Sequence, residues 1–159
     1  MKIGTPKEVY EGENRVAMTP DSAKQLQKLG HECYVETGAG MAAGFSDALY
    51  EEAGVTVVKT PAALWKDVDI IAKVRQPNET ELKRLTADKT LISFFNPAGN
   101  EPGMEAAKAK GATVIAMEMV PRISRAQKMD ALSSMANIAG YRAVIEAGNN
   151  FGRFFTGQV

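Results

Sequence analysis

Residues 120–134 place many polar side chains in one connection. They comprise cations, an amide, a carboxylate and hydroxyls, namely Arg122, Ser124, Arg125, Gln127, Lys128, Asp130, Ser133 and Ser134. Irregular connections held by a rigid scaffold are where binding residues concentrate. Asp130 lies near two of the cations, which predicts that its carboxylate stays ionised and accepts hydrogen bonds. The segment is therefore the first candidate for a binding site.

Further polar residues follow the predicted strands of the chain. Lys7 and Arg15 follow the first strand, Lys73 and Arg75 end the fourth, and Asn96 follows the fifth. Ligands of open parallel sheets bind outside the carboxyl ends of the strands, so we expect these residues to gather at one edge. Taken singly, Arg15, Lys73 or Arg122 is better explained as a solvated surface cation. Lys73 fits that explanation less well, because it follows the continuous core run Ile70-Ile71-Ala72.

A glycine-containing segment, Gly38-Ala39-Gly40-Met41-Ala42-Ala43, fits the dinucleotide-binding pattern G-x-G-x-x-G/A. It follows the second predicted strand instead of the first. The acidic residue expected about 20 positions later is replaced by Val57-Val58-Lys59. We therefore interpret the segment as a glycine-rich turn.

Composition narrows the classes of function. With 159 residues, 45% of them hydrophobic, the chain can bury the core of one domain without disulfides or metal. Lys plus Arg and Asp plus Glu number 19 each, which gives no basic field for nucleic acid. The single cysteine, Cys33, is predicted to be a buried thiol in a reducing compartment. The single histidine, His31, predicts neither a metal site nor a catalytic triad, and we expect it at the surface.

Strands and helices alternate along the chain. Strands are predicted at residues 2–5, 32–36, 55–58, 69–74, 90–95 and 113–117. Helix starts are predicted at Thr19-Pro20, Ser46, Thr60-Pro61 and the capping-box pair Asn78 and Glu81, and a further helix runs through Met104. This alternation predicts an α/β fold of three layers, with a mainly parallel sheet and helices on both faces, similar to flavodoxin or Rossmann domains.

The last predicted helix spans about Met129–Asn149 and is rich in Ala, Ser and Gly. We expect residues 1–149 to form one domain, and residues 150–159 to begin a connection to a second domain. The chain has no run of the ~18 apolar residues that a membrane helix needs, which predicts a soluble segment.

Five stretches carry a resemblance to a known family. They are Pro121–Val144, Met1–Glu8, Glu13–Ala17, Glu36–Gly40 and Phe151–Gln158. With them the chain resembles, over its whole length, the NAD(H)-binding alpha subunits of proton-translocating NAD(P) transhydrogenases. More distantly it is similar to alanine dehydrogenases, which share the architecture. The resemblance implies that the missing second domain is an NAD-binding Rossmann domain, and that NAD(H) is held mainly there.

The resemblance also implies roles for single residues. Arg122 would contact the nicotinamide end of NAD(H), and Asp130 and Ser133 would orient its carboxamide. Gln127 would help align the NADP(H) nicotinamide bound by a partner domain. Gln127 and Asp130 are thus the expected catalytic residues, and Arg122, Gln127, Asp130 and Ser133 the expected cofactor-binding residues, with no metal. Direct hydride transfer between two nicotinamides releases no proton, so positioning and electrostatics suffice.

The partners implied are a beta subunit with the NADP(H)-binding domain, a membrane-embedded proton channel and a second copy of the NAD(H)-binding component. The implied location is the cytoplasmic side of the bacterial inner membrane. We expect the isolated fragment to be inactive.

Two other functions stay open. An alanine dehydrogenase-like domain would use Arg15 and Lys73 as anion contacts, but Asn96 stands where that enzyme is expected to have its catalytic histidine. A non-enzymatic docking module would use the small-residue helix and the Phe-rich tail as an oligomer interface.

Overall fold

The computed structural model describes residues 1–157. The chain divides into two compact units, Met1–Met117 and Glu118–Val159. Each unit is considered by itself below.

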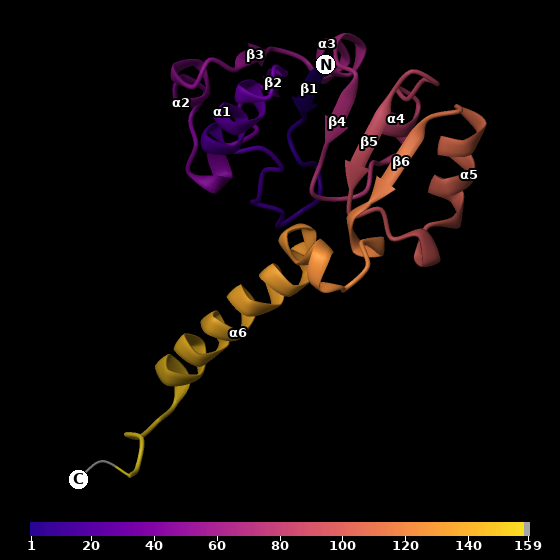
Figure 1. Ribbon diagram of the computed structural model, residues 1–159. Coiled ribbons are helices and arrows are strands. Elements are labelled where there is room, and N and C mark those ends of the chain that lie inside the picture. Colours follow the sequence, from indigo (N-terminus) through magenta and orange to yellow (C-terminus); the bar gives the residue numbers. More distant parts are fainter. Residues whose placement is uncertain (158–159) are drawn as a thin grey trace. The chain divides into compact units, whose positions relative to one another are not determined.

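The first unit is built on a six-stranded sheet. Its strands are β1 (Lys2–Thr5), β2 (Glu32–Glu36), β3 (Thr56–Val58), β4 (Ile70–Ala72), β5 (Thr90–Ser93) and β6 (Thr113–Ala116). They lie side by side in the order β3-β2-β1-β4-β5-β6 (Figure 1). Every pairing is parallel. This is the strand order of a doubly wound Rossmann-like fold, which confirms the predicted fold class.

Helices connect the strands. They are α1 (Pro20–Lys28), α2 (Asp47–Glu52), α3 (Pro61–Asp67), α4 (Glu79–Leu82) and α5 (Glu101–Ala109), with short 3₁₀ helices η1 (Met41–Ala43) and η2 (Pro97–Gly99). The predicted caps Thr19, Thr60 and Asn78 each accept a hydrogen bond from a first-turn backbone amide. Ser46 precedes α2, but its side chain makes no capping hydrogen bond.

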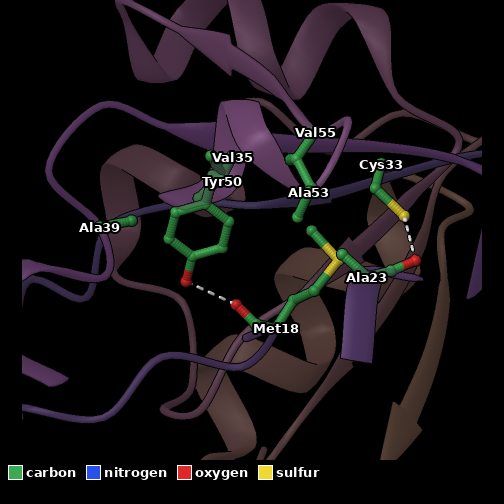
Figure 2. Close-up of a cluster of buried hydrophobic side chains, with 8 residues drawn as sticks. All are labelled: Met18, Ala23, Cys33, Val35, Ala39, Tyr50, Ala53 and Val55. Atoms are coloured by element: carbon green, nitrogen blue, oxygen red, sulfur yellow. Dashed lines mark hydrogen bonds between the residues drawn. The ribbon is translucent and has the colours of Figure 1, made fainter. Parts of the chain in front are cut away.

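Helices α1 and α2 cover one face of the sheet. The buried residues there are Met18, Ala23, Cys33, Val35, Ala39, Tyr50, Ala53 and Val55 (Figure 2). The Tyr50 hydroxyl donates to the Met18 carbonyl at 2.8 Å, which satisfies the polar end of a ring that is completely buried. The predicted buried thiol, Cys33, lies 3.7 Å from the Ala23 carbonyl oxygen in the same cluster.

Helices α3, α4 and α5 cover the opposite face. Tyr34 packs there, although its neighbours Cys33 and Val35 point to the first face, as alternation along a strand requires. The core of this face is formed by Trp65, Val68, Ile71, Leu85, Leu91, Phe95 and Ala107. Gly4 lets α3 approach closely, because a Cβ atom there would lie 2.8 Å from Val68 Cγ1.

The second unit consists mainly of one long helix and the turns before it. The 3₁₀ helix η3 (Met117–Met119) ends the first unit and begins the second, and η4 (Ser124–Met129) and α6 (Ala131–Asn150) follow. The long helix begins at Ala131, two residues after the predicted start at about Met129, because Ser124–Met129 adopt the tighter 3₁₀ geometry and Asp130 is the N-cap. None of the residues of α6 is buried. Within residues 1–157, no helix is both long and apolar enough to cross a membrane.

Candidate functional site

Two groups of polar residues stand out, one in each unit. In the first unit they lie where β1 and β4 end. These two strands are neighbours in the sheet. From β1 the strands β2 and β3 extend the sheet on one side, and β4, β5 and β6 extend it on the other side. Such a switch point is where doubly wound sheets bind ligands. The structure therefore brings the loop after β1 next to Lys73 and Arg75 after β4, as predicted.

Lys73 is the centre of a buried ion cluster. Its side chain is fully buried, and its Nζ lies 2.5 Å from Glu81 Oε1 and 3.8 Å from Glu8 Oε2. Glu8 also accepts hydrogen bonds from the backbone amides of Val74 at 2.6 Å and Arg75 at 3.3 Å. Burial raises the pKa of Glu8, against the opposing effect of the nearby Lys73 ammonium. The cluster therefore fixes the loop after β1 to the end of β4.

Glu13 forms a second, adjoining cluster. Its carboxylate accepts from Arg15 Nε at 2.7 Å, from Arg15 Nη2 at 2.6 Å and from Arg75 Nε at 2.6 Å. The hydrogen bond from the Arg15 side chain is the main reason that the pKa of Glu13 falls to about 2. The two clusters together pair three cations with three carboxylates. The switch point is thus filled by charges that neutralise one another.

This pairing favours an architectural role for Lys73 over an anion contact. A fully buried ammonium beside two carboxylates is part of the architecture and has no surface to offer a ligand. Arg15 keeps 37% of its side chain exposed. It lines a pocket of about 120 Å³ with the loop after β1 and the glycine-rich turn.

The glycine-containing segment, residues 38–43, is a structural turn, as its sequence was interpreted. It follows β2, and Gly38 has a φ of 71°, which favours glycine. The backbone amide of Gly38 donates to Asp47 Oδ1 at 2.8 Å, and Thr37 donates to the other carboxylate oxygen at 2.6 Å. Asp47 thus occupies two of the hydrogen-bond donors of this turn. The residues directly after β1, Pro6-Lys7-Glu8, include no glycine, and the one glycine of the connection to α1 is Gly12.

Two other residues considered from the sequence lie apart from these clusters. Asn96 is exposed after β5 in a left-handed conformation, with φ 54° and ψ 59°. His31 follows α1 and is partly buried, and its Nδ1 has no hydrogen-bond partner among the described residues. Within the described part of the chain, no group of three or more potential ligands could hold a metal ion.

In the second unit, Asp130 organises the segment predicted as the main site. Its Oδ1 accepts from the Ser133 backbone amide at 2.9 Å, and its Oδ2 accepts from the Ser133 hydroxyl at 2.6 Å. These two bonds, and to a smaller extent the charge of Arg122, lower the pKa of Asp130. The carboxylate therefore stays ionised as the N-cap of α6. A carboxylate has about four acceptor sites, so each oxygen can still accept from a ligand.

The remaining candidates lie on η4 and beside it, with Arg122 before η4, Gln127 within it and Ser133 in the first turn of α6. Gln127, Arg122 and Ser133 are exposed, and only Ala126 of η4 is buried. Backbone hydrogen bonds from Ala126 to Ile123 and from Asp130 to Gln127 have the three-residue spacing of a 3₁₀ turn. The segment is an ordered turn that presents an amide, a carboxylate and a hydroxyl to solvent.

Sequence reasoning missed the acidic partners of the first-unit cations. Glu8 and Glu13 belong to stretches that carry the family resemblance, and Glu81 was identified only as a capping residue. A usable signal was present, because a lysine that follows a continuous core strand is rarely buried without a paired charge.

Together, the strand order and the polar switch point define a doubly wound α/β domain of the Rossmann-like class. Residues 4–139 match the family described as "Alanine dehydrogenase/PNT, N-terminal domain". The chain therefore belongs to the alanine dehydrogenase/PNT N-terminal domain family.

Similar proteins agree with this assignment. The NAD(P) transhydrogenase subunit alpha of Cereibacter sphaeroides is 71% identical over 159 residues, which are 100% of this chain and 30% of that protein. The crystal structure of transhydrogenase from Sinorhizobium meliloti has a TM-score of 0.91 at 42% identity, over 96% of this chain and 46% of that one. An alanine dehydrogenase of Halomonas elongata is 38% identical over 93% of this chain and 39% of its own length. The chain thus spans less than half of each relative.

Proposed function

We propose that this chain is the N-terminal α/β domain of an NAD(P) transhydrogenase alpha subunit. The complete enzyme would transfer hydride from NADH to NADP⁺ and couple the transfer to proton translocation across the membrane. The observation that supports this most is the ionised Asp130–Ser133 pair at the start of α6, in a chain 71% identical throughout to such a subunit.

The exposed turn suits the recognition of a nicotinamide carboxamide. The Asp130 carboxylate would accept from the carboxamide NH₂ group, and the Ser133 hydroxyl oxygen would accept a second bond from it. Arg122 would donate to the carboxamide oxygen, and its charge already lowers the pKa of Asp130. Gln127, exposed on η4, would align the NADP(H) nicotinamide.

The chemistry of hydride transfer belongs to the nicotinamide rings themselves. The residues of this chain would orient the rings and exchange no proton with them, which agrees with the absence of histidine from residues 118–157. Orientation alone is worth several orders of magnitude in rate when two reactants are held in an attack geometry.

The rest of the assembly follows from the same proposal. A second Rossmann domain of the same subunit would hold most of NAD(H). A beta subunit would carry NADP(H), a membrane-embedded part would conduct protons, and two NAD(H)-binding components would form a homodimer. This domain would then lie on the cytoplasmic side of the bacterial inner membrane.

The test uses the complete alpha subunit reconstituted with the beta subunit. We expect Asp130→Asn and Gln127→Ala to lower transhydrogenation at least tenfold, and the exposed control Asp88→Asn to leave it unchanged. NADH affinity, measured by calorimetry, should weaken for Asp130→Asn. Unchanged turnover in both variants would refute the assigned roles, and tight NAD binding by residues 1–159 alone would refute the two-domain arrangement.

An alanine dehydrogenase-like function is the second candidate, because relatives with that name cover most of this chain. It would require Arg15 to bind the substrate carboxylate without help from the buried Lys73. Alanine-dependent reduction of NAD by the complete protein would support it. If the complete protein catalyses transhydrogenation but no alanine-dependent reduction of NAD, this candidate is eliminated.

A further inference from the structure

A pocket of about 340 Å³ lies in the first unit, away from the ion clusters of the switch point. Its wall combines one side of α3 with the connection between α4 and β5. Lys89 ends this connection and directly precedes β5, so the pocket lies at the amino ends of the parallel strands. A volume of this size is at the lower end of the range for small-molecule sites.

The indole of Trp65 brings a buried donor without an acceptor to this wall. The residue is 1% exposed, and its Nε1 has no hydrogen-bond partner among the described residues. A buried tryptophan N–H usually has a partner, because an unpaired donor has lost its hydrogen bonds to water. Polar atoms of Thr5, His31 and Ser93 are also unpaired, but none of these residues lines the pocket.

Lys89 adds a buried charge to the same wall. The residue is 7% exposed, and its Nζ donates to the carbonyl oxygens of Lys66 at 3.0 Å and Val68 at 2.6 Å. An ammonium has three donors, so one remains. Asp88 Oδ2 lies 3.5 Å from Nζ, which is longer than an ordinary hydrogen bond. Lys89 therefore keeps unused donor capacity.

Two further cations complete the pocket. Arg84 is half-buried and Lys66 is exposed, and neither side chain makes an ion pair or a hydrogen bond with a described residue. With Lys89 they place three positive charges against the one carboxylate of Asp88. Exposed cations alone are ordinary surface residues. These differ because they surround a pocket whose buried members, Trp65 and Lys89, also have unused donors.

We infer that this pocket binds a small molecule through a phosphate group. A phosphate carries the charge opposite to that of the wall, and the guanidinium of Arg84 can donate to two of its oxygens at once. Lys66 and Lys89 would donate to the others. The N–H of Trp65 would donate as well, and because its Nε1 has almost no exposed surface, this contact requires a small shift of neighbouring side chains.

A phosphate suits these donors better than a carboxylate does. The donors come from two separate segments, α3 and the connection before β5. A tetrahedral phosphate presents oxygens in several directions, whereas the two oxygens of a carboxylate lie in one plane and would leave some donors unpaired. The pocket also lies at the edge of the sheet opposite to the one where doubly wound sheets bind their ligands. The bound molecule would therefore be an effector that stabilises the folded domain.

The experiment titrates the complete protein with inorganic phosphate and with glycerol phosphate, at constant ionic strength and with chloride as the reference anion. Calorimetry measures binding, and nuclear magnetic resonance follows the indole N–H signal of Trp65, identified by its loss in Trp65→Phe. The site variant carries Lys66→Gln and Arg84→Gln. The matched control carries Lys28→Gln and Lys59→Gln, which remove the same charge at exposed positions of the first unit.

We expect phosphate to bind the wild type and the control equally and to move the Trp65 signal in both. The site variant should bind phosphate about tenfold more weakly, because it lacks two of the three cations. Both of its substitutions lie outside the core, so its circular dichroism should match that of the wild type. Tighter binding of glycerol phosphate would assign the site to phosphomonoesters, and tighter binding of inorganic phosphate would assign it to the free ion.

Three results would overturn the inference. Wild-type affinity in the site variant would show that phosphate binds elsewhere. No heat and no movement of the signal beyond that caused by chloride would show that no phosphate site exists. Calorimetric binding with an unmoved Trp65 signal would exclude this pocket as the site. Each of these results leaves the proposed function intact, because none of the residues assigned to the nicotinamides lines the pocket.

Discussion

Replacing Lys73 with methionine tests whether the switch point is held by a buried ion cluster. The substitution keeps most of the volume of the side chain but leaves Glu8 and Glu81 buried without their shared cation. Breaking a buried ion pair by removing one partner costs about 3–5 kcal/mol. We therefore expect a large loss of folding free energy near neutral pH.

The least costly response of the variant is to bind a proton at one of the two carboxylates. From an ordinary glutamate pKa of 4.5, protonation at about pH 7 costs roughly 3 kcal/mol, because each pKa unit corresponds to about 1.4 kcal/mol. This protonation cost agrees with the lower end of the range of free energies for breaking a buried ion pair. We expect Lys73→Met to lose about 3 kcal/mol at pH 7.

The pH dependence gives the sharper test. Burial already raises the pKa of Glu8 in the wild type, so the folded chain binds that proton more tightly than the unfolded chain. Stability therefore falls as the pH rises from the unfolded pKa to the folded one. Removal of the Lys73 charge raises the folded pKa further, which extends the loss to higher pH. The defect of Lys73→Met should be large at pH 7 and small near pH 4.5.

Urea titration can follow unfolding through the fluorescence of Trp65, the single tryptophan, which is 1% exposed in the core beside Ile71. The exposed Lys110→Met variant is the matched control and should unfold like the wild type. A Lys73→Met variant that loses less than about 1 kcal/mol at pH 7 would refute the cluster as described. An equal loss at both pH values would attribute the defect to packing instead of charge.

Three further predictions concern other parts of the chain. Glu13→Gln should lower the free energy of unfolding by about 1–2 kcal/mol above pH 4.5 in urea titrations, a range discounted for the exposure of its arginine partners. Because the pKa of Glu13 falls to about 2, the greater stability of the wild type is lost as the pH decreases toward that value. Gly40→Ala should lower thermal stability by about 2 kcal/mol, since its Cβ would lie 2.6 Å from Tyr50 Cε2, whereas Gly140→Ala, with no atom within 4 Å, should raise it by about 1 kcal/mol. Asp130→Asn should increase amide hydrogen exchange in the first turn of α6 near pH 7. In the wild type, protection of these amides should persist below the ordinary aspartate pKa, because the pKa of Asp130 is lowered. Unchanged exchange in the variant would show that the Asp130 cap does not stabilise the start of the helix.

Strands, helix caps and other features that depend on residues close together in the sequence were predicted well. The strands at Lys2–Thr5 and Glu32–Glu36 were found to the residue, because apolar runs and turn residues mark both ends. The capping box of Asn78 and Glu81 was likewise correct, since its geometry follows from a three-residue spacing. Alternating elements of this kind were enough to give the fold class.

The contents of the candidate sites could not be predicted in the same way. Glu8 accepts the Val74 amide across 66 positions of sequence, so this contact exists only once β1 and β4 are neighbours in the sheet. The 3₁₀ turn Ser124–Met129 was expected to be an irregular connection, because short i to i+3 helices have no strong pattern of apolar residues.

The cations of this chain differ in their energetic situations, and the difference bears on where a ligand could bind. In the first unit, pairing lowers the energy of Arg15, Lys73 and Arg75 and fixes a loop to the sheet, so a ligand would have to replace carboxylates already in place. Arg125 and Lys128 of the second unit have no such partners among the described residues, and neither have the exposed Lys28 and Lys59 of the first unit. The buried cluster therefore favours a rigid scaffold, whereas exposed cations of this kind are ordinary solvated residues.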